Sequence, residues 1–179
     1  MRVCFFDIET TNLNAFMGRI LTCGFLDLNG TPYVFRGDDP KYKARNQLDD
    51  SKLVKAIKEE LTKYNMIVGW NSKLFDVPFI NARLAKSDQL PVKPQFHLDL
   101  MYYSTGSAMR IGSRKLDNVS KFLLPEEEQK TPISWEDWGL AGIGDKKGMN
   151  QVVKHNLADL LVTRNVYWKL LPYVANIHR

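Results

Sequence analysis

An acid-bearing apolar segment near the start constrains this chain more than any other. Residues 3–13 read VCFFDIETTNL, a run of β-branched and aromatic residues that predicts a buried strand. Because side chains alternate across a strand, Asp7 and Glu9 point to the same face. Adjacent carboxylates repel each other and are costly to desolvate without a positive partner, and hard divalent cations such as Mg²⁺ prefer oxygen ligands. The simpler alternative is a strand that ends in two solvated acids.

Length and composition indicate one soluble domain. The chain has 179 residues, 44% of them hydrophobic and 25% charged, which suits a single well-buried core over residues 1–179. No apolar segment reaches the length of a membrane span, and the start lacks the features of a signal peptide, so we expect a cytoplasmic protein with no membrane partner. Cys4 and Cys23 lie in apolar, strand-like runs and are expected to be buried, reduced thiols.

The net charge of +5 favours a partner with a phosphate backbone. Gathering several acids in one site would leave the remaining surface more positive still. General solubility explains the same charge, so this observation does not decide between the two.

Periodicity and turn residues predict alternating strands and helices. Further strands are expected at 18–27, 31–36, 66–70 and 96–100, and helices at 50–64, 72–86, 115–124 and 149–173. Asn29-Gly30 suits a tight hairpin turn with positive φ, and Ser72 suits a helix cap. Residues 125–148 are expected to form a long polar loop. This order indicates an α/β fold, in which helices flank both faces of a mixed β-sheet.

Acids recur in three segments. The first is FDIET at 6–10, the second is NSKLFDVPF at 71–79, and the third is HNLAD at 155–159. In the third segment His155 and Asp159 are four residues apart and therefore share one face of the predicted helix.

These segments, in this order, resemble the DEDD superfamily of 3′–5′ exonucleases, which has a ribonuclease H-like fold. They are most similar to the proofreading domains of family-B DNA polymerases, and the resemblance covers essentially the whole chain. It implies that Asp7, Glu9, Asp76 and Asp159 bind two divalent metal ions, Mg²⁺ or Mn²⁺. Phosphodiester hydrolysis needs an activated water and stabilised charge on the phosphate and leaving oxygen, and two cations about 4 Å apart can serve all three needs.

His155 departs from the two common patterns of that superfamily. One subgroup has tyrosine four residues before the last acid, and the other has histidine five residues before it. His155 takes the tyrosine's spacing with the histidine's chemistry. We interpret it as the group that orients or deprotonates the attacking water, because a neutral imidazole accepts a proton near neutral pH. The alternative is a surface or packing histidine.

The same resemblance implies four residues that bind substrate. Thr10 and Leu13 would contact the terminal nucleotide, with Leu13 wedged between the last bases, and Asn71 and Phe75 would line the opposite wall. For Leu13 and Phe75, core packing is the alternative. Apolar contacts to unstacked bases tolerate any sequence, which fits single-stranded 3′ ends.

The expected function is metal-dependent 3′–5′ exonuclease activity on single-stranded nucleic acid, with DNA favoured, by a chain that works alone or with a polymerase or other replication or repair partner. An RNA-trimming exonuclease of the same superfamily is one alternative, because 2′-OH recognition depends on pocket shape. The other is an inactive nucleic-acid-binding or scaffold module. Four intact acids argue against the scaffold, since an unused acidic cluster destabilises a fold.

Overall fold

The computed structural model describes residues 1–44, 46, 48–106, 109–129 and 132–174. Within these residues lies a mixed five-stranded sheet with the order β3-β2-β1-β4-β5. Its strands are β1 (Val3–Thr10), β2 (Ile20–Asp27), β3 (Tyr33–Arg36), β4 (Met66–Gly69) and β5 (Phe96–Asp99). The first three strands pair antiparallel, whereas β4 and β5 run parallel to β1.

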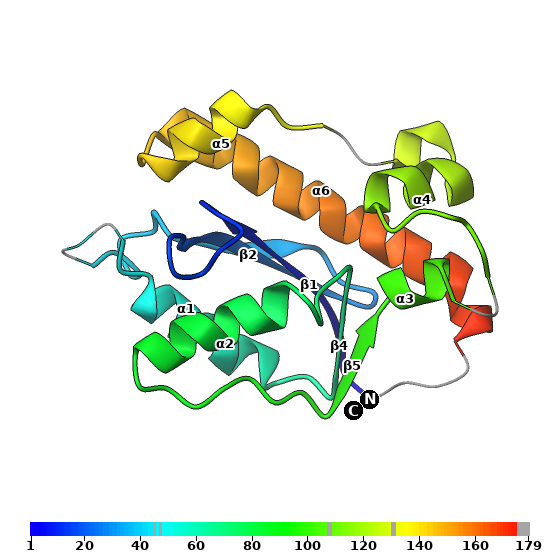
Figure 1. Cartoon of the computed structure of the whole chain (residues 1–179), viewed down its shortest axis with the longest axis horizontal. Coiled ribbons are helices and arrows are strands. Elements are labelled where there is room, and N and C mark those ends of the chain that lie inside the picture. Colours follow the sequence, from blue (N-terminus) through cyan, green and yellow to red (C-terminus); the bar gives the residue numbers. More distant parts are fainter. Residues whose placement is uncertain (45, 47, 107–108, 130–131, 175–179) are drawn as a thin grey trace.

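Helices cover both faces of the sheet (Figure 1). One layer consists of α1 (Ser51–Leu61) and α2 (Asp76–Lys86). On the other side lie α4 (Leu116–Leu123), α5 (Trp135–Gly142) and the long α6 (Lys146–Leu170), with short α3 (Met101–Ser104) after β5. The 3₁₀ helices are η1 (Glu126–Glu128) and η2 (Leu171–Tyr173). This arrangement confirms the predicted α/β fold with helices on both faces.

Alternation along β1 decides which layer each side chain meets. Cys4, Phe6 and Ile8 belong to the core under α1 and α2. Val3 and Phe5 belong to the core under α4 and α6. Asp7 and Glu9 have the parity of Val3 and Phe5, so the acids lie on the face that α6 covers.

The α1 prediction is confirmed, since Leu53, Ile57 and Leu61 are buried along one face. A buried ion pair joins the start of this helix to α2, because Arg83 Nη2 lies 2.6 Å from Asp50 Oδ1. Together these contacts unite α1 and α2 into one layer.

Two smaller predictions concern the cysteines and the hairpin. Cys4 and Cys23 are buried and free, as predicted, and burial raises the pKa of both thiols. The β2–β3 hairpin is present, and the Gly30 N–H donates to the carbonyl of Asp27. The expected positive φ at Asn29 and Gly30 is wrong, because neither residue adopts it.

The predicted loop at 125–148 is wrong, because it contains η1 and α5. Helix α5 buries only Ala141 among its residues, so its sequence lacks the apolar face that reveals a helix. Its start does carry a local signal, since Ser134 Oγ accepts a hydrogen bond from the Asp137 N–H at 3.0 Å. Residues 130–131 of the same expected loop lie outside the described residues.

A glycine allows α5 to pack closely on α6. A Cβ at Gly148 would lie 2.6 Å from the Ala141 nitrogen and 2.7 Å from the Asp137 carbonyl. Helix α6 begins at Lys146, earlier than predicted, and the Asp145 side chain caps it by accepting a hydrogen bond from the Gly148 N–H. Its end also differs, since η2 follows Leu170.

The expected cap at Ser72 is also wrong. Phe75 precedes α2, and no side chain caps that helix. The Ser72 hydroxyl is instead within hydrogen-bond distance of His97 Nε2, at 2.9 Å. Among the described helices, none combines the length and the apolar character that crossing a membrane requires.

Candidate active site

Asp7 is held by a residue from the far end of the chain. Asn156 Nδ2 donates to Asp7 Oδ2 at 2.7 Å and to the Asp7 carbonyl at 3.2 Å. The amide oxygen of Asn156 accepts from Thr22 Oγ1 at 3.2 Å. Asn156 is fully buried, so these bonds fix the Asp7 carboxylate against α6.

A glycine in β2 makes this contact possible. Gly24 lies opposite Asp7 in the β1–β2 ladder. A Cβ at Gly24 would come within 2.7 Å of Asn156 Oδ1 and of Leu160 Cδ1. A larger residue at this position would therefore force the Asn156 and Leu160 side chains to shift and would disturb the bond from Asn156 to Asp7.

The side chains of Glu9, His155 and Asp159 also approach one another on this face. His155 Nε2 lies 3.9 Å from Glu9 Oε1 and 3.7 Å from Asp159 Oδ2. All three side chains are buried. Burial makes a surface position wrong for His155, whereas its ring contact with Trp138 fits the packing alternative. The imidazole lies between two of the predicted acids.

Asp76 reaches β1 from the other side of the sheet. Its Oδ1 accepts a hydrogen bond from the Ile8 N–H at 3.0 Å, just beyond the point where β1 pairs with β4. Burial raises the pKa of Asp76 well above its usual value, and the nearby Asp7 charge raises it further. A positive charge beside Asp7 and Asp76 would relieve both effects.

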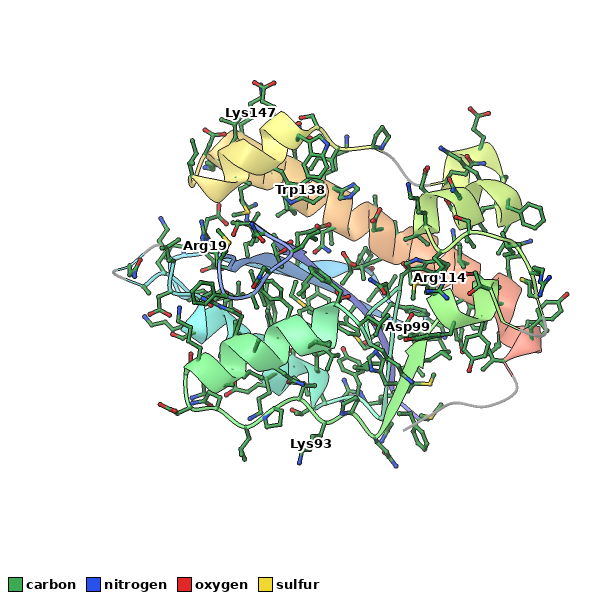
Figure 2. All side chains as sticks on the ribbon, viewed as in Figure 1. Arg19, Lys93, Asp99, Arg114, Trp138 and Lys147 are labelled. Atoms are coloured by element: carbon green, nitrogen blue, oxygen red, sulfur yellow. The ribbon has the colours of Figure 1, made fainter. Side chains whose placement is uncertain are left out.

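Asp99, which is labelled in Figure 2, accepts hydrogen bonds from the turn that leads to Asp76. Its Oδ1 accepts from the Asn71 N–H at 2.9 Å, and its Oδ2 accepts from the Lys73 N–H at 2.9 Å. Asn71 adopts φ +59°, which asparagine tolerates better than most residues. Burial raises the pKa of Asp99, although these hydrogen bonds oppose the shift. Asp99 lies in a strand predicted from the sequence, but no role was expected for its carboxylate.

Two hollows border the acid-bearing end of β1. A cavity of about 440 Å³ is lined by Asp7, Asp159 and Asn71, together with Arg114 and Lys115. A groove of about 880 Å³ has a lining that includes Glu9 and the predicted substrate residues Thr10, Leu13 and Phe75. The structure thus places the predicted substrate residues next to the acids, with Asn71 in one hollow and the other three in its neighbour.

Leu13 and Phe75 differ in how exposed they are. Leu13 is 83% exposed, so the core-packing alternative is wrong for it. Phe75 is partly buried and packs against the core that contains Phe79, so part of that alternative holds.

The donor set suits a hard divalent cation. The residues predicted to bind metal supply only carboxylate oxygens, which Mg²⁺ and Mn²⁺ prefer. Within the part of the chain that the structure describes, however, no three His, Cys, Asp or Glu side chains stand in a group ready to hold a metal ion.

Two contacts in this region were missed from the sequence. Asn156 lies beside His155 in the third segment, but its partner Asp7 is 149 residues away. Trp138 packs its ring edge-on against the His155 ring, with centroids 5.3 Å apart. No pattern in the sequence predicts either contact, although Asn156 belongs to the segment HNLAD.

Comparisons with known proteins agree with the fold. A family model described as the RNase_H superfamily matches residues 4–171. Among solved structures, the family B DNA polymerase from the hyperthermophilic archaeon Pyrobaculum calidifontis is similar, with a TM-score of 0.73 and 20% identity. The match covers 97% of this chain and 25% of the polymerase, so the chain spans about a quarter of that protein's length. A comparison with curated proteins gave no match.

Proposed function

Because this chain belongs to the ribonuclease H superfamily, we propose that it is a metal-dependent 3′–5′ exonuclease acting on single-stranded nucleic acid, with DNA favoured over RNA. The observation that carries the proposal is the convergence of acids from three distant segments at the end of β1. Asp76 bonds to the β1 backbone, and Asp159 lines a cavity with Asp7. We propose residues 1–179 as one exonuclease domain.

The proposed metal ligands are Asp7, Glu9, Asp76 and Asp159. Two divalent ions, Mg²⁺ or Mn²⁺, would supply an activated water and stabilise charge on the phosphate and the leaving oxygen. The chain's own contribution is to position this donor set. Asn156 holds the Asp7 carboxylate, and the Ile8 N–H holds that of Asp76.

His155 is the proposed proton acceptor. Its Nε2 faces the carboxylates of Glu9 and Asp159, and a neutral imidazole there takes a proton from the attacking water or orients that water. Trp138 of α5 packs against the imidazole in a T-shaped contact and helps to hold its orientation.

Substrate contacts follow from the two hollows. We propose that Thr10, Leu13 and Phe75 contact the last nucleotides in the larger groove, while Asn71 lines the smaller cavity. The proposed partner is a single-stranded 3′ end, which a polymerase or another replication or repair protein could deliver.

The test is a time course on matched DNA and RNA oligonucleotides labelled at either end. With Mg²⁺ or Mn²⁺, we expect a 5′-labelled strand to shorten stepwise and a 3′-labelled strand to release labelled mononucleotide at once. Asp7→Ala should lower the rate by at least about 100-fold, because it removes a proposed metal ligand. Glu59→Ala, which alters an exposed acid of α1, is the matched control and should not change the rate.

The outcomes separate the alternatives. Faster loss of RNA than of DNA would favour the RNA-trimming exonuclease. Stepwise shortening of a 3′-labelled strand would overturn the proposed polarity. Equal rates for wild type and Asp7→Ala would overturn the assignment of the site.

A further inference from the structure

Exposed apolar side chains form part of the lining of the larger groove, which also includes Glu9. Helix α5 contributes Trp135, which is 90% exposed, and Trp138 to the groove lining. Further exposed apolar residues on the same rim are Leu13 at 83%, Ile143 at 74% and Met17 at 71%. Apolar side chains that gather on the surface of a protein often mark a binding site, whereas single exposed apolar residues do not.

The tryptophans are arranged so that one ring stays open. The ring centroids of Trp135 and Trp138 lie 6.2 Å apart with 37° between their planes, and Trp138 also touches His155. Trp138 thus connects the groove lining to His155. In Figure 2, Trp138 and Arg19 are labelled on the side of α5 that faces the sheet. The indole of Trp135 contacts Trp138 and is otherwise exposed to solvent.

The surroundings favour a nucleobase over a protein segment as the occupant. Glu9 lines the same groove as both tryptophans, so a ligand bound to the tryptophans lies in the same groove as one of the proposed metal ligands. Arg19 is the lining cation, and the chain carries a net charge of +5, which suits a phosphate-bearing ligand. A volume of about 880 Å³ matches sites that enclose a small ligand.

We propose that Trp135 is a stacking platform for an unstacked base near the 3′ end of a single-stranded nucleic acid, with Trp138 supporting it. This inference rests on the proposed function and adds a base-binding wall to it. An indole face stacks on any base, so the contact is independent of sequence. Trp135 and Leu13 both line the groove that this base would enter.

Binding is tested by fluorescence anisotropy with a 5′-fluorescein oligodeoxynucleotide of roughly eight nucleotides, in EDTA so that it stays intact. We expect Trp135→Ala to weaken binding by about 5- to 100-fold, the range for loss of one stacked base. Trp135→Phe should keep most of the affinity. The control Phe122→Ala removes a 71% exposed aromatic ring from α4 and should bind as the wild type does.

An abasic oligonucleotide separates stacking from phosphate contact. When the last two positions lack bases, wild-type binding should fall at least to the level of Trp135→Ala with the intact strand, because Leu13 and Phe75 lose their proposed base contacts as well. With the abasic strand, the Trp135→Ala substitution should cause little further loss of affinity. Because Trp135 is exposed, the variant should melt at the wild-type temperature, which excludes unfolding as the cause.

The failures are distinguishable. If wild type binds and digests the strand but Trp135→Ala does so equally well, this inference is overturned and the proposed function stands. If wild type neither binds nor digests it, both are overturned. A dimer detected by light scattering that Trp135→Ala abolishes, with oligonucleotide affinity unchanged, would replace this inference with a protein interface.

Discussion

At the scale of single residues, Asn156 connects the fold to the chemistry. Its side chain donates a 2.7 Å hydrogen bond to the Asp7 carboxylate, and Thr22 and Gly24 shape its position. Polar groups that orient metal ligands usually matter nearly as much as the ligands themselves. Asn156 is therefore the residue whose loss should expose the role of Asp7 without removing an acid.

We predict that Asn156→Leu raises the Mn²⁺ concentration for half-maximal nuclease activity by roughly 10- to 100-fold, because Asp7 loses its orientation. Titration of activity with Mn²⁺ measures this effect. The matched control is Asn165→Leu, which alters an asparagine of the same helix that bonds to Glu128. Wild-type metal dependence in Asn156→Leu would contradict the positioning role.

At the scale of elements, the joint between β5 and the β4–α2 turn depends on a buried histidine. His97 on β5 lies 2.9 Å from the Ser72 hydroxyl in that turn. Burial, with a smaller effect of the Lys73 charge, lowers the pKa of His97 to about 4 from an ordinary 6.5. The histidine is therefore neutral in the folded protein at physiological pH.

This shift predicts how stability changes with pH. Between pH 6.5 and 4 the unfolded chain binds a proton at His97 that the folded chain does not, so the free energy of unfolding falls as pH falls. The full contribution is present above pH 6.5 and is lost by about pH 4. It should be on the order of 3 kcal/mol.

Urea unfolding of wild type and His97→Gln at several pH values tests the prediction. Other titrating groups are common to both proteins, so the difference between the two curves isolates His97. The stability advantage of wild type should shrink as pH drops from 7 to 4.5. Parallel pH profiles for the two proteins would show that the His97 pKa is not lowered by folding.

At the scale of the whole molecule, acids from three segments create a demand for positive charge at the end of β1. Burial beside Asp7 raises the pKa of Asp76, and Glu9 and Asp159 flank His155. A cation that binds only the folded protein must stabilise it. We therefore predict that Mn²⁺ at about 100 times its dissociation constant adds about 2.7 kcal/mol.

For a domain of this size, that gain should raise the melting temperature by roughly 5–10 °C. A thermal melt with and without Mn²⁺ measures the shift, and Asp7→Asn should abolish most of it. Glu59→Ala should retain it. If wild type shows neither a shift nor nuclease activity, the inactive scaffold becomes the better description.

Much of the fold was predictable because its signals are local. Alternation along β1 places Asp7 and Glu9 on one face, and four-residue spacing buries Leu53 and Ile57 in α1. Helix α5 was missed because its exposed Trp135 gives no amphipathic pattern; it forms by packing on α6 where Gly148 lets the backbones approach. The contact between Ser72 and His97 replaced a predicted cap for a similar reason, since its partner lies 25 residues away.

The sequence by itself determined the acid-bearing strand, the order of the strands and the spacing of His155 and Asp159, because backbone geometry fixes which side chains share a face over a few residues. Only the tertiary structure decided that Asn156 orients Asp7, that Asp76 reaches the β1 backbone and that two tryptophans wall the groove. Those contacts join segments up to 149 residues apart, and their geometry depends on how closely α6 packs over Gly24. No local pattern encodes that distance, because it results from the packing of the whole core.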